Sequence, residues 1–156
     1  MSAFPSNVVD ILAERFELLM DEHTIIKRTI RLNDPNPCLG IFAVEWQPQI
    51  ETVHMGQEEP VLNRYLYQIQ NMVSHYEEQQ GRDLFSINAK VVKAILYRDA
   101  NLKLSLQALS ETILDTRETL KRHGVARQRY TSGQVASNWS FIATTDYWIE
   151  TEATLL

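Results

Sequence analysis

The sequence predicts an α+β protein, with a mostly antiparallel sheet, two main helices packed on one face of it, and a protruding loop or hairpin arm. Two segments repeat apolar residues at helical spacing, and two others alternate apolar and polar residues as half-buried strands do. The elements follow the order helix, strands, helix, strands. The 156 residues fit a single domain, 1–156, that can bury its own core.

The first predicted helix follows Pro5, with Ser6 as its N-cap, and ends at about Met20 or Asp21. Four apolar residues at helical spacing form its inner stripe: Val8, Leu12, Phe16 and Leu19. A helix of this kind must bury that stripe against another element, and we expect the sheet to provide the cover.

Strands are predicted on both sides of a turn. Residues 23–32 alternate weakly and could form a short strand, whereas the two prolines in 33–37 require a turn. The continuous apolarity of 38–46 predicts a strand covered on both faces. Residues 47–60, which include Pro48, form the predicted arm. In the long strand predicted at 61–76, the residues that share one face are Tyr65, Tyr67, Ile69 and Val73.

A second helix is predicted over 84–99, after a polar turn at 77–82 and with Asp83 as its cap. Its expected inner stripe is Leu84, Ile87, Val91 and Ile95, widened by Val92 and Leu96. The stretch 99–116 is open to two interpretations, a strand in which alternate leucines share a face or a packed loop with a short helical turn.

The chain ends in two predicted strands that can join as a hairpin through 131–137. The first, 117–133, is polar and is expected to break near Gly124. In the closing strand the apolar face consists of Trp139, Phe141, Ala143, Thr145, Tyr147 and Ile149. The opposite face carries Ser140, Thr144, Asp146 and Glu150.

No pattern of chemistry-bearing residues points to an enzyme. Phosphate-binding glycine loops, zinc-protease motifs and paired cysteines are missing from the sequence, and its four histidines fall in four different segments. Cys38 fits a small buried hydrophobe better than a nucleophile. The net charge of −5 argues against a protein that coats nucleic acid or binds anionic membrane. We therefore expect no catalytic residues, no cofactor, no metal, and neither a signal peptide nor a membrane span.

Charge is distributed unevenly along the chain. Five cations and one acid, Glu118, occupy 117–129, whereas residues 10–22 hold five acids and one arginine. An ordinary mixed surface explains any single charge. Two sharper interpretations are a subunit whose opposite faces attract each other head to tail, and a basic strand facing the phosphates of passing DNA. Trp46 and Trp148 are either covered by a neighbouring element or exposed as interface anchors.

The order of elements resembles the tail terminator, or tail tube completion, proteins of long-tailed bacteriophages. Most specific is the closing segment, where "WSFIATTDYWIE" from Trp139 to Glu150 follows "RQRYTSGQVASNW". The resemblance implies a homohexameric ring that caps the tail tube and stops its polymerisation. The ring would contact the tail tube protein on one face and the head–tail connector on the other. Genomic DNA would pass through its lumen without sequence-specific binding.

The resemblance also implies a virion location at the tail–neck junction after assembly in the bacterial cytoplasm. The alternatives are a head-completion or neck connector protein of the same virion, and a small non-viral α+β binding module. Candidate interface residues, for contact with a subunit, the tube or the lumen, are Trp46, Glu58, Glu59, Arg117, Lys121, Arg122, Arg127, Arg129, Asp146, Trp148 and Glu150. Reversing the charge of Arg122 or Arg127 is expected to weaken assembly and to leave the fold intact.

Overall fold

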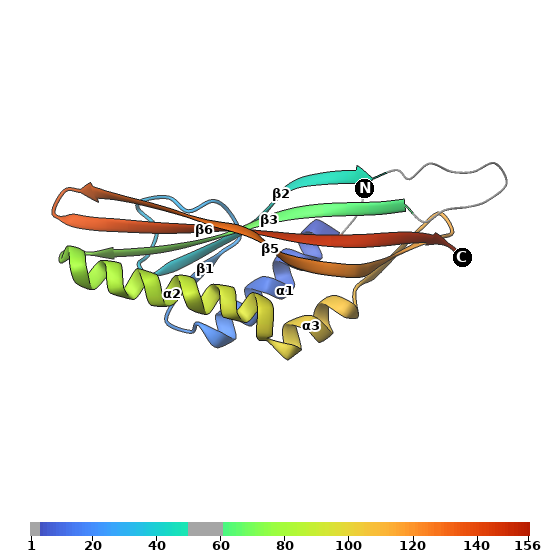
Figure 1. Ribbon diagram of the computed structural model, residues 1–156, viewed down its shortest axis with the longest axis horizontal. Helices are drawn as coiled ribbons and strands as arrows, with labels where there is room; N and C mark the ends of the chain where they lie inside the picture. Colours follow the sequence, from blue (N-terminus) through green and yellow to red (C-terminus); the bar gives the residue numbers. More distant parts are fainter. Residues whose placement is uncertain (1–3, 50–60) are drawn as a thin grey trace.

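The computed structural model describes residues 4–49 and 61–156, which form a mixed α+β fold (Figure 1). In these residues three helices accompany a curled, mostly antiparallel sheet of six strands. The elements in chain order are α1 (Phe4–Leu19), β1 (Thr24–Ile26), β2 (Cys38–Gln49), β3 (Val61–His75), α2 (Glu78–Arg98), α3 (Ala100–Gln107), β4 (Ser110–Ile113), β5 (Thr116–Val135) and β6 (Asn138–Leu155).

The sheet has the strand order β1-β2-β3-β6-β5-β4, and every neighbouring pair is antiparallel except β1 with β2. At its centre β3 and β6 pair along their whole length, from Val61 opposite Ala153 to His75 opposite Trp139. The closing segment of the chain is therefore a central strand and not an edge. The predicted mostly antiparallel α+β architecture is confirmed at this level.

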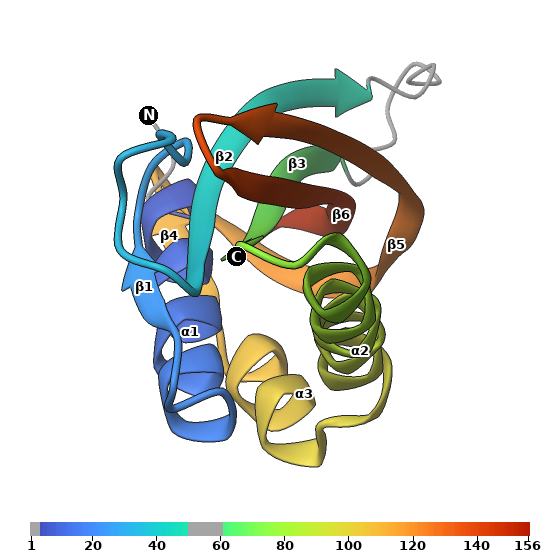
Figure 2. The same cartoon turned by 90° about the vertical axis from the view of Figure 1, so that its left-hand side faces the viewer.

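The sheet curves over the three helices, which lie on its inner face (Figure 2). The main core joins residues of all three helices to those of β2, β3 and β6. Inward-facing residues of β3 and β6 stand opposite each other in the register, as Tyr67 does opposite Tyr147. The burial of Phe141, Ala143, Thr145, Tyr147 and Ile149 confirms the predicted apolar face of the closing strand.

Helix α2 differs from the prediction in its start and in its buried stripe. It begins at Glu78, so the expected polar turn at 77–82 is largely helical and Asp83 is not its cap. Leu84 and Ile87, expected inside, are 47% and 58% exposed. The buried residues are Gly81, Phe85, Ala89, Val92, Ile95 and Leu96.

A close approach at Gly81 explains the rotation of α2. A Cβ atom there would lie 2.8 Å from the Phe141 ring and 2.9 Å from Cβ of His75. The extra N-terminal turn thus packs tightly on the strands and turns Phe85 toward them, where its ring lies 5.6 Å from that of Phe141.

The ambiguous stretch 99–116 contains helix α3 and strand β4. Leu102 and Leu106 are fully buried, whereas Leu104 between them is largely exposed, as helical spacing requires. Arg15 of α1 donates to the Asp99 carboxylate at 2.6 Å and ties the corner between α2 and α3 to α1. This hydrogen bond lowers the pKa of Asp99. The fold therefore uses three helices on the inner face instead of two.

Two predictions for the strands need correction. Strand β5 is not broken at Gly124 but continues through it, with register shifts on either side. Strand β2 is covered on both faces only at its start, because Val44 and Trp46 are exposed. Beyond Gly40 it has no β1 partner. The predicted hairpin between β5 and β6 is confirmed. Of the expected arm, residues 47–49 continue strand β2, and residues 50–60 lie outside the described residues.

Candidate interaction surface

The face of the sheet that points away from the helices, called the outer face here, carries a row of arginines on β5. They stand opposite alternate residues of β6 and so share one face: Arg117, Arg122, Arg127 and Arg129. In a regular strand Arg117 and Arg122 would point to opposite faces. One extra residue in each register shift, Lys121 and Ala126, corrects the alternation. The bulges therefore create the arginine row.

Each of two buried carboxylates on β6 holds arginines of this row. Arg122 binds Glu150 with two hydrogen bonds of 3.0 and 3.2 Å. The Glu150 side chain is only 3% exposed, whereas that of Arg122 is 63% exposed. Asp146, also buried, receives Arg127 at 2.9 Å and Arg129 at 3.2 Å. The arginines thus form a lid over the acids, and a partner would meet Asp146 and Glu150 only through them.

The remaining two cations of the candidate set are differently placed. Arg117 and Lys121 are exposed and belong to neither of the ion pairs over Asp146 and Glu150. Lys121 is the extra residue of the first bulge. Arg117 and Lys121 can contact a partner without exposing a buried acid, whereas the paired arginines cannot.

Trp148 lies half-buried in the centre of the outer face. The Arg64 guanidinium lies 4.6 Å from its ring centroid and that of Arg122 lies 5.9 Å away. The indole also rests on Gly124, where a Cβ atom would approach the ring to 2.9 Å. Neighbouring residues therefore cover most of Trp148, as the first of its two interpretations expected. The cation–π contacts hold the ring in place.

Trp46 belongs to a buried polar network on the inner face, although its own side chain is exposed. Its indole N–H donates to Asn63 at 3.1 Å, and the Asn63 amide donates to Glu118 at 3.2 Å. The same Glu118 oxygen accepts hydrogen bonds from Tyr65, at 2.7 Å, and from Thr151. This network was not predicted from the sequence. Its only signal was Glu118 itself, the single acid in a basic strand.

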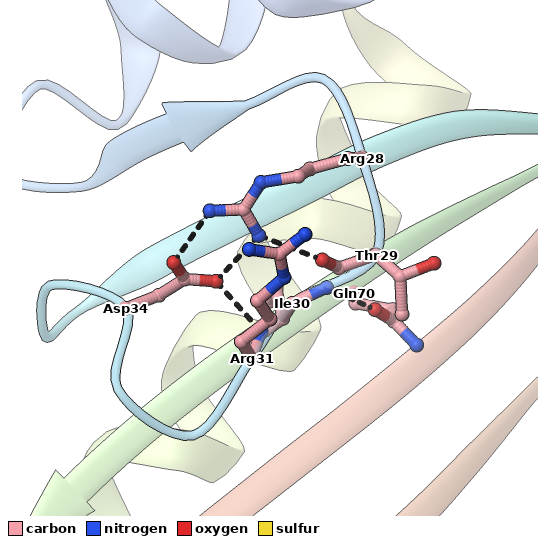
Figure 3. Close-up of polar contacts among 6 residues, drawn as sticks. All are labelled: Arg28, Thr29, Ile30, Arg31, Asp34 and Gln70. Atoms are coloured by element: carbon pink, nitrogen blue, oxygen red, sulfur yellow. Dashed lines mark hydrogen bonds and ion pairs between the residues drawn. The ribbon is translucent and has the colours of Figure 1, made fainter.

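The segment between β1 and β2 covers the outer face of the sheet where β2 begins (Figure 3). Arg28 holds Asp34 with hydrogen bonds of 2.6 and 2.9 Å, and the Arg31 N–H also donates to Asp34. These bonds lower the pKa of Asp34 to about 2. The Ile30 N–H donates to Gln70 of β3 at 2.9 Å, which fastens the segment to the sheet.

Chemically reactive side chains are not gathered at any point of the described chain. Cys38 is fully buried, as predicted, and burial raises the pKa of its thiol to about 11. Burial lowers the pKa of His23 and that of His123, and the Tyr147 hydroxyl lies 2.7 Å from Nδ1 of His123. In residues 4–49 and 61–156 no group of three acid, histidine or cysteine side chains could hold a metal ion.

The candidate residues are thus only partly brought together. Five of them come together on the outer face, where Arg122, Arg127 and Arg129 form the lid over Asp146 and Glu150. Trp148 adjoins that lid, Arg117 and Lys121 flank it, and Trp46 lies apart on β2. Glu58 and Glu59 lie outside the described residues.

Comparison with protein-family models and with curated proteins finds no match for this chain. Among the described helices, none combines the length and the apolar character needed to cross a bilayer.

Proposed function

We propose that this chain is a phage tail terminator, a structural protein whose copies form a ring at the end of the tail tube. In this role the ring, a homohexamer, stops tube polymerisation and joins the tail to the head-side connector. DNA passes through its lumen. The resemblance of the closing segment, Trp139–Glu150, suggests the family, and the outer face of the sheet supports an assembly role.

The observation that carries the proposal is the state of the outer face around β6. Its side chains are long and polar, yet several are held in place by the buried acids Asp146 and Glu150 and by Trp148. Side chains that are already ordered lose little conformational entropy when a partner binds. A surface of this kind suits contact with another protein of the virion.

Pairing with acids also bears on the proposed DNA conduit. An arginine that shares its charge with a carboxylate 3.0 Å away, as Arg122 does with Glu150, attracts a phosphate less than a lone cation. A channel for DNA must let the duplex slide, so moderate attraction without base-reading residues suits a lumen. The segment that joins β2 to β3 would provide contact with the tube, while the helices occupy the inner face.

Localisation in the virion tests this function. Antibody against the chain, coupled to gold, should label virions of the phage that encodes it at one point between tail tube and head. A variant phage without the chain should make tubes of irregular length or tails unable to join heads. Label along the tube, or no label on intact virions, would contradict the proposal. Normal tubes with defective heads would instead favour a head-completion protein.

A further inference from the structure

The solvent face of α2 is basic and partly apolar. Ile87, Lys90, Ala94 and Tyr97 recur at spacings of three, four and three residues, so they share the helix side opposite the buried stripe. Ile87 and Tyr97 are large apolar side chains that are about half exposed. A surface hollow of about 470 Å³ lies over this side, lined by Lys90, Lys93, Ala94, Tyr97 and Arg98.

The solvent face of α1 is acidic and carries one large apolar side chain. Asp10, Glu14 and Glu17 recur at spacings of four and three residues and are all exposed. Leu18 beside them is 67% exposed. Asp10 is paired with Lys27 at 2.7 Å, but Glu14 and Glu17 take part in no ion pair within the described residues. An exposed leucine beside acids that form no ion pair is complementary in charge and shape to the basic hollow on α2.

These two helix faces lie on opposite sides of the molecule. Figure 2 shows α1 and α2 at the two ends of the helix layer, with α3 between them. The two charged sets cannot neutralise each other within one chain from these positions. Among residues 4–49 and 61–156, Lys90, Lys93 and Arg98 have no ion-pair partner.

We propose that the acidic face of α1 in one copy of this chain docks into the basic hollow on α2 of the next copy. Leu18 fills the space over Ala94, while Glu14 and Glu17 face Lys90 and Lys93. Two different faces meet in this contact, so it is head to tail and builds a closed ring when the rotation between copies permits. The proposal supplies the subunit contact of the ring and rests on the ring function proposed above.

The basic half of the proposed contact lies on α2 and not on β5. The cations of β5 would have been the obvious complement to α1, but three of the arginines already serve Asp146 and Glu150. Opposite charges across a contact favour the correct partner and orientation, and an exposed apolar side chain in a hollow adds the buried area.

Charge-swapped variants of the full chain test the contact. Lys90→Glu with Lys93→Glu, and separately Glu14→Lys with Glu17→Lys, should each weaken self-association at least about tenfold, because like charges then face each other. Mixing the two variants should restore it, since each junction in an alternating ring again joins opposite charges. Native mass spectrometry and sedimentation over a concentration series would measure the assemblies, and circular dichroism would check the fold.

The matched control is Arg31→Glu with Lys103→Glu, which makes the same change in net charge at two exposed side chains outside the acidic face of α1 and the basic hollow on α2. Its self-association should equal that of the unaltered protein. The inference is overturned if the control variant dissociates as readily as the α2 variant, if mixing restores nothing, or if the unaltered protein stays monomeric at every concentration. The gold-labelling result does not depend on any of these outcomes, so failure of this contact and failure of the terminator function can be distinguished.

Discussion

The molecule has two groups of exposed cations, and they differ in what lies beneath them. On β5 the arginines cover two buried carboxylates, as Arg122 covers Glu150 with two hydrogen bonds. On α2 the cations Lys90, Lys93 and Arg98 surround a hollow over Ala94, and no described acid pairs with them. The three paired arginines of β5, Arg122, Arg127 and Arg129, complete the fold of their own chain, whereas the cations of α2 are available to another chain.

This difference shows that a local excess of positive charge in a sequence does not by itself locate a binding surface. The densest run, 117–129, looks the most suited to an acidic partner until the register of β5 and β6 is known. Its charge is then partly cancelled by residues 17 to 28 positions away in the sequence. The cations around the α2 hollow are fewer, but no ion pair neutralises them within the described residues because they face solvent.

The largest loss of stability is expected from Arg122→Glu. It leaves Glu150 buried without its partner and adds a like charge beside it, so the unfolding free energy should fall by about 3 kcal/mol. This revises the expectation from the sequence that charge reversal here leaves the fold intact. Urea denaturation measures the loss. Arg117→Glu, on the same strand but over no buried acid, should change the free energy by less than about 0.5 kcal/mol.

Equal stability of the two variants would contradict the distinction between paired and available cations. Lys90→Glu provides the same comparison on α2, where the unfolding free energy should stay within about 0.5 kcal/mol of the unaltered value. A large loss from Lys90→Glu would mean that the α2 cations serve the fold as well.

A smaller effect is expected from Gly124→Ala, which disturbs the packing beneath Trp148. A Cβ atom at this position would lie 2.9 Å from the indole ring, so the ring or the strand must shift, at a cost of about 2 kcal/mol. The variant should also change the near-ultraviolet circular dichroism of tryptophan. Gly133→Ala is the matched control on the same strand, because no atom lies within 4 Å of its Cβ. Similar losses from both would show that strand flexibility, and not Trp148, sets the effect.

The fold was predicted well where one periodicity dominated. The alternation of β6 is satisfied by a single buried face, as at Tyr147. In α1 three of the four residues of the expected stripe are buried, but Leu19 is 45% exposed, and the helix begins at Phe4, before the expected cap Ser6. Helix α2 carries two apolar stripes, and the sequence does not say which is buried. The choice of Phe85 over Ile87 depends on the close contact of Gly81 with Phe141, residues 60 positions apart. Contacts between such distant residues cannot be read from local spacing.

The candidate surface was predicted only as a set of residues. The sequence singled out Arg122, Asp146 and Glu150, but not that they would pair with one another. That pairing depends on the two bulges of β5, and a bulge adds one residue without a distinctive sequence signal. The network around Glu118 was missed for the same reason, because its donors come from β3 and β6.

Two histidines test how the interior of the protein tolerates a new charge. Burial lowers the pKa of His23 and that of His123 below the usual 6.5. The folded state therefore binds these protons less readily than the unfolded chain. Stability is fully present above pH 6.5 and should fall as the pH drops below it, by less than in Arg122→Glu. Urea denaturation at pH 7 and pH 5 measures the change.

His123→Gln should reduce that pH dependence because it removes one of the two titrating groups. The glutamine side chain retains polar atoms near the Tyr147 hydroxyl, which lies 2.7 Å from Nδ1 of His123 in the unaltered protein. An unchanged dependence between pH 7 and pH 5 in this variant would exclude His123 as a source of it.

The smallest effect on stability is expected from the ion pair between Arg28 and Asp34, which closes a loop and covers no buried acid of the sheet. The hydrogen bonds from Arg28 and the Arg31 N–H hold the pKa of Asp34 at about 2, below its usual 3.8. The stabilisation is therefore present above pH 3.8 and is lost as the pH falls toward 2. Asp34→Asn should remove this acid dependence while leaving the neutral-pH fold in place. Carboxyl-carbon NMR titration measures the pKa directly. A midpoint near 3.8 would show that the bonds to Asp34 do not persist in solution, and amide exchange at Ile30 would then be fast as well, because the segment would no longer be held against Gln70.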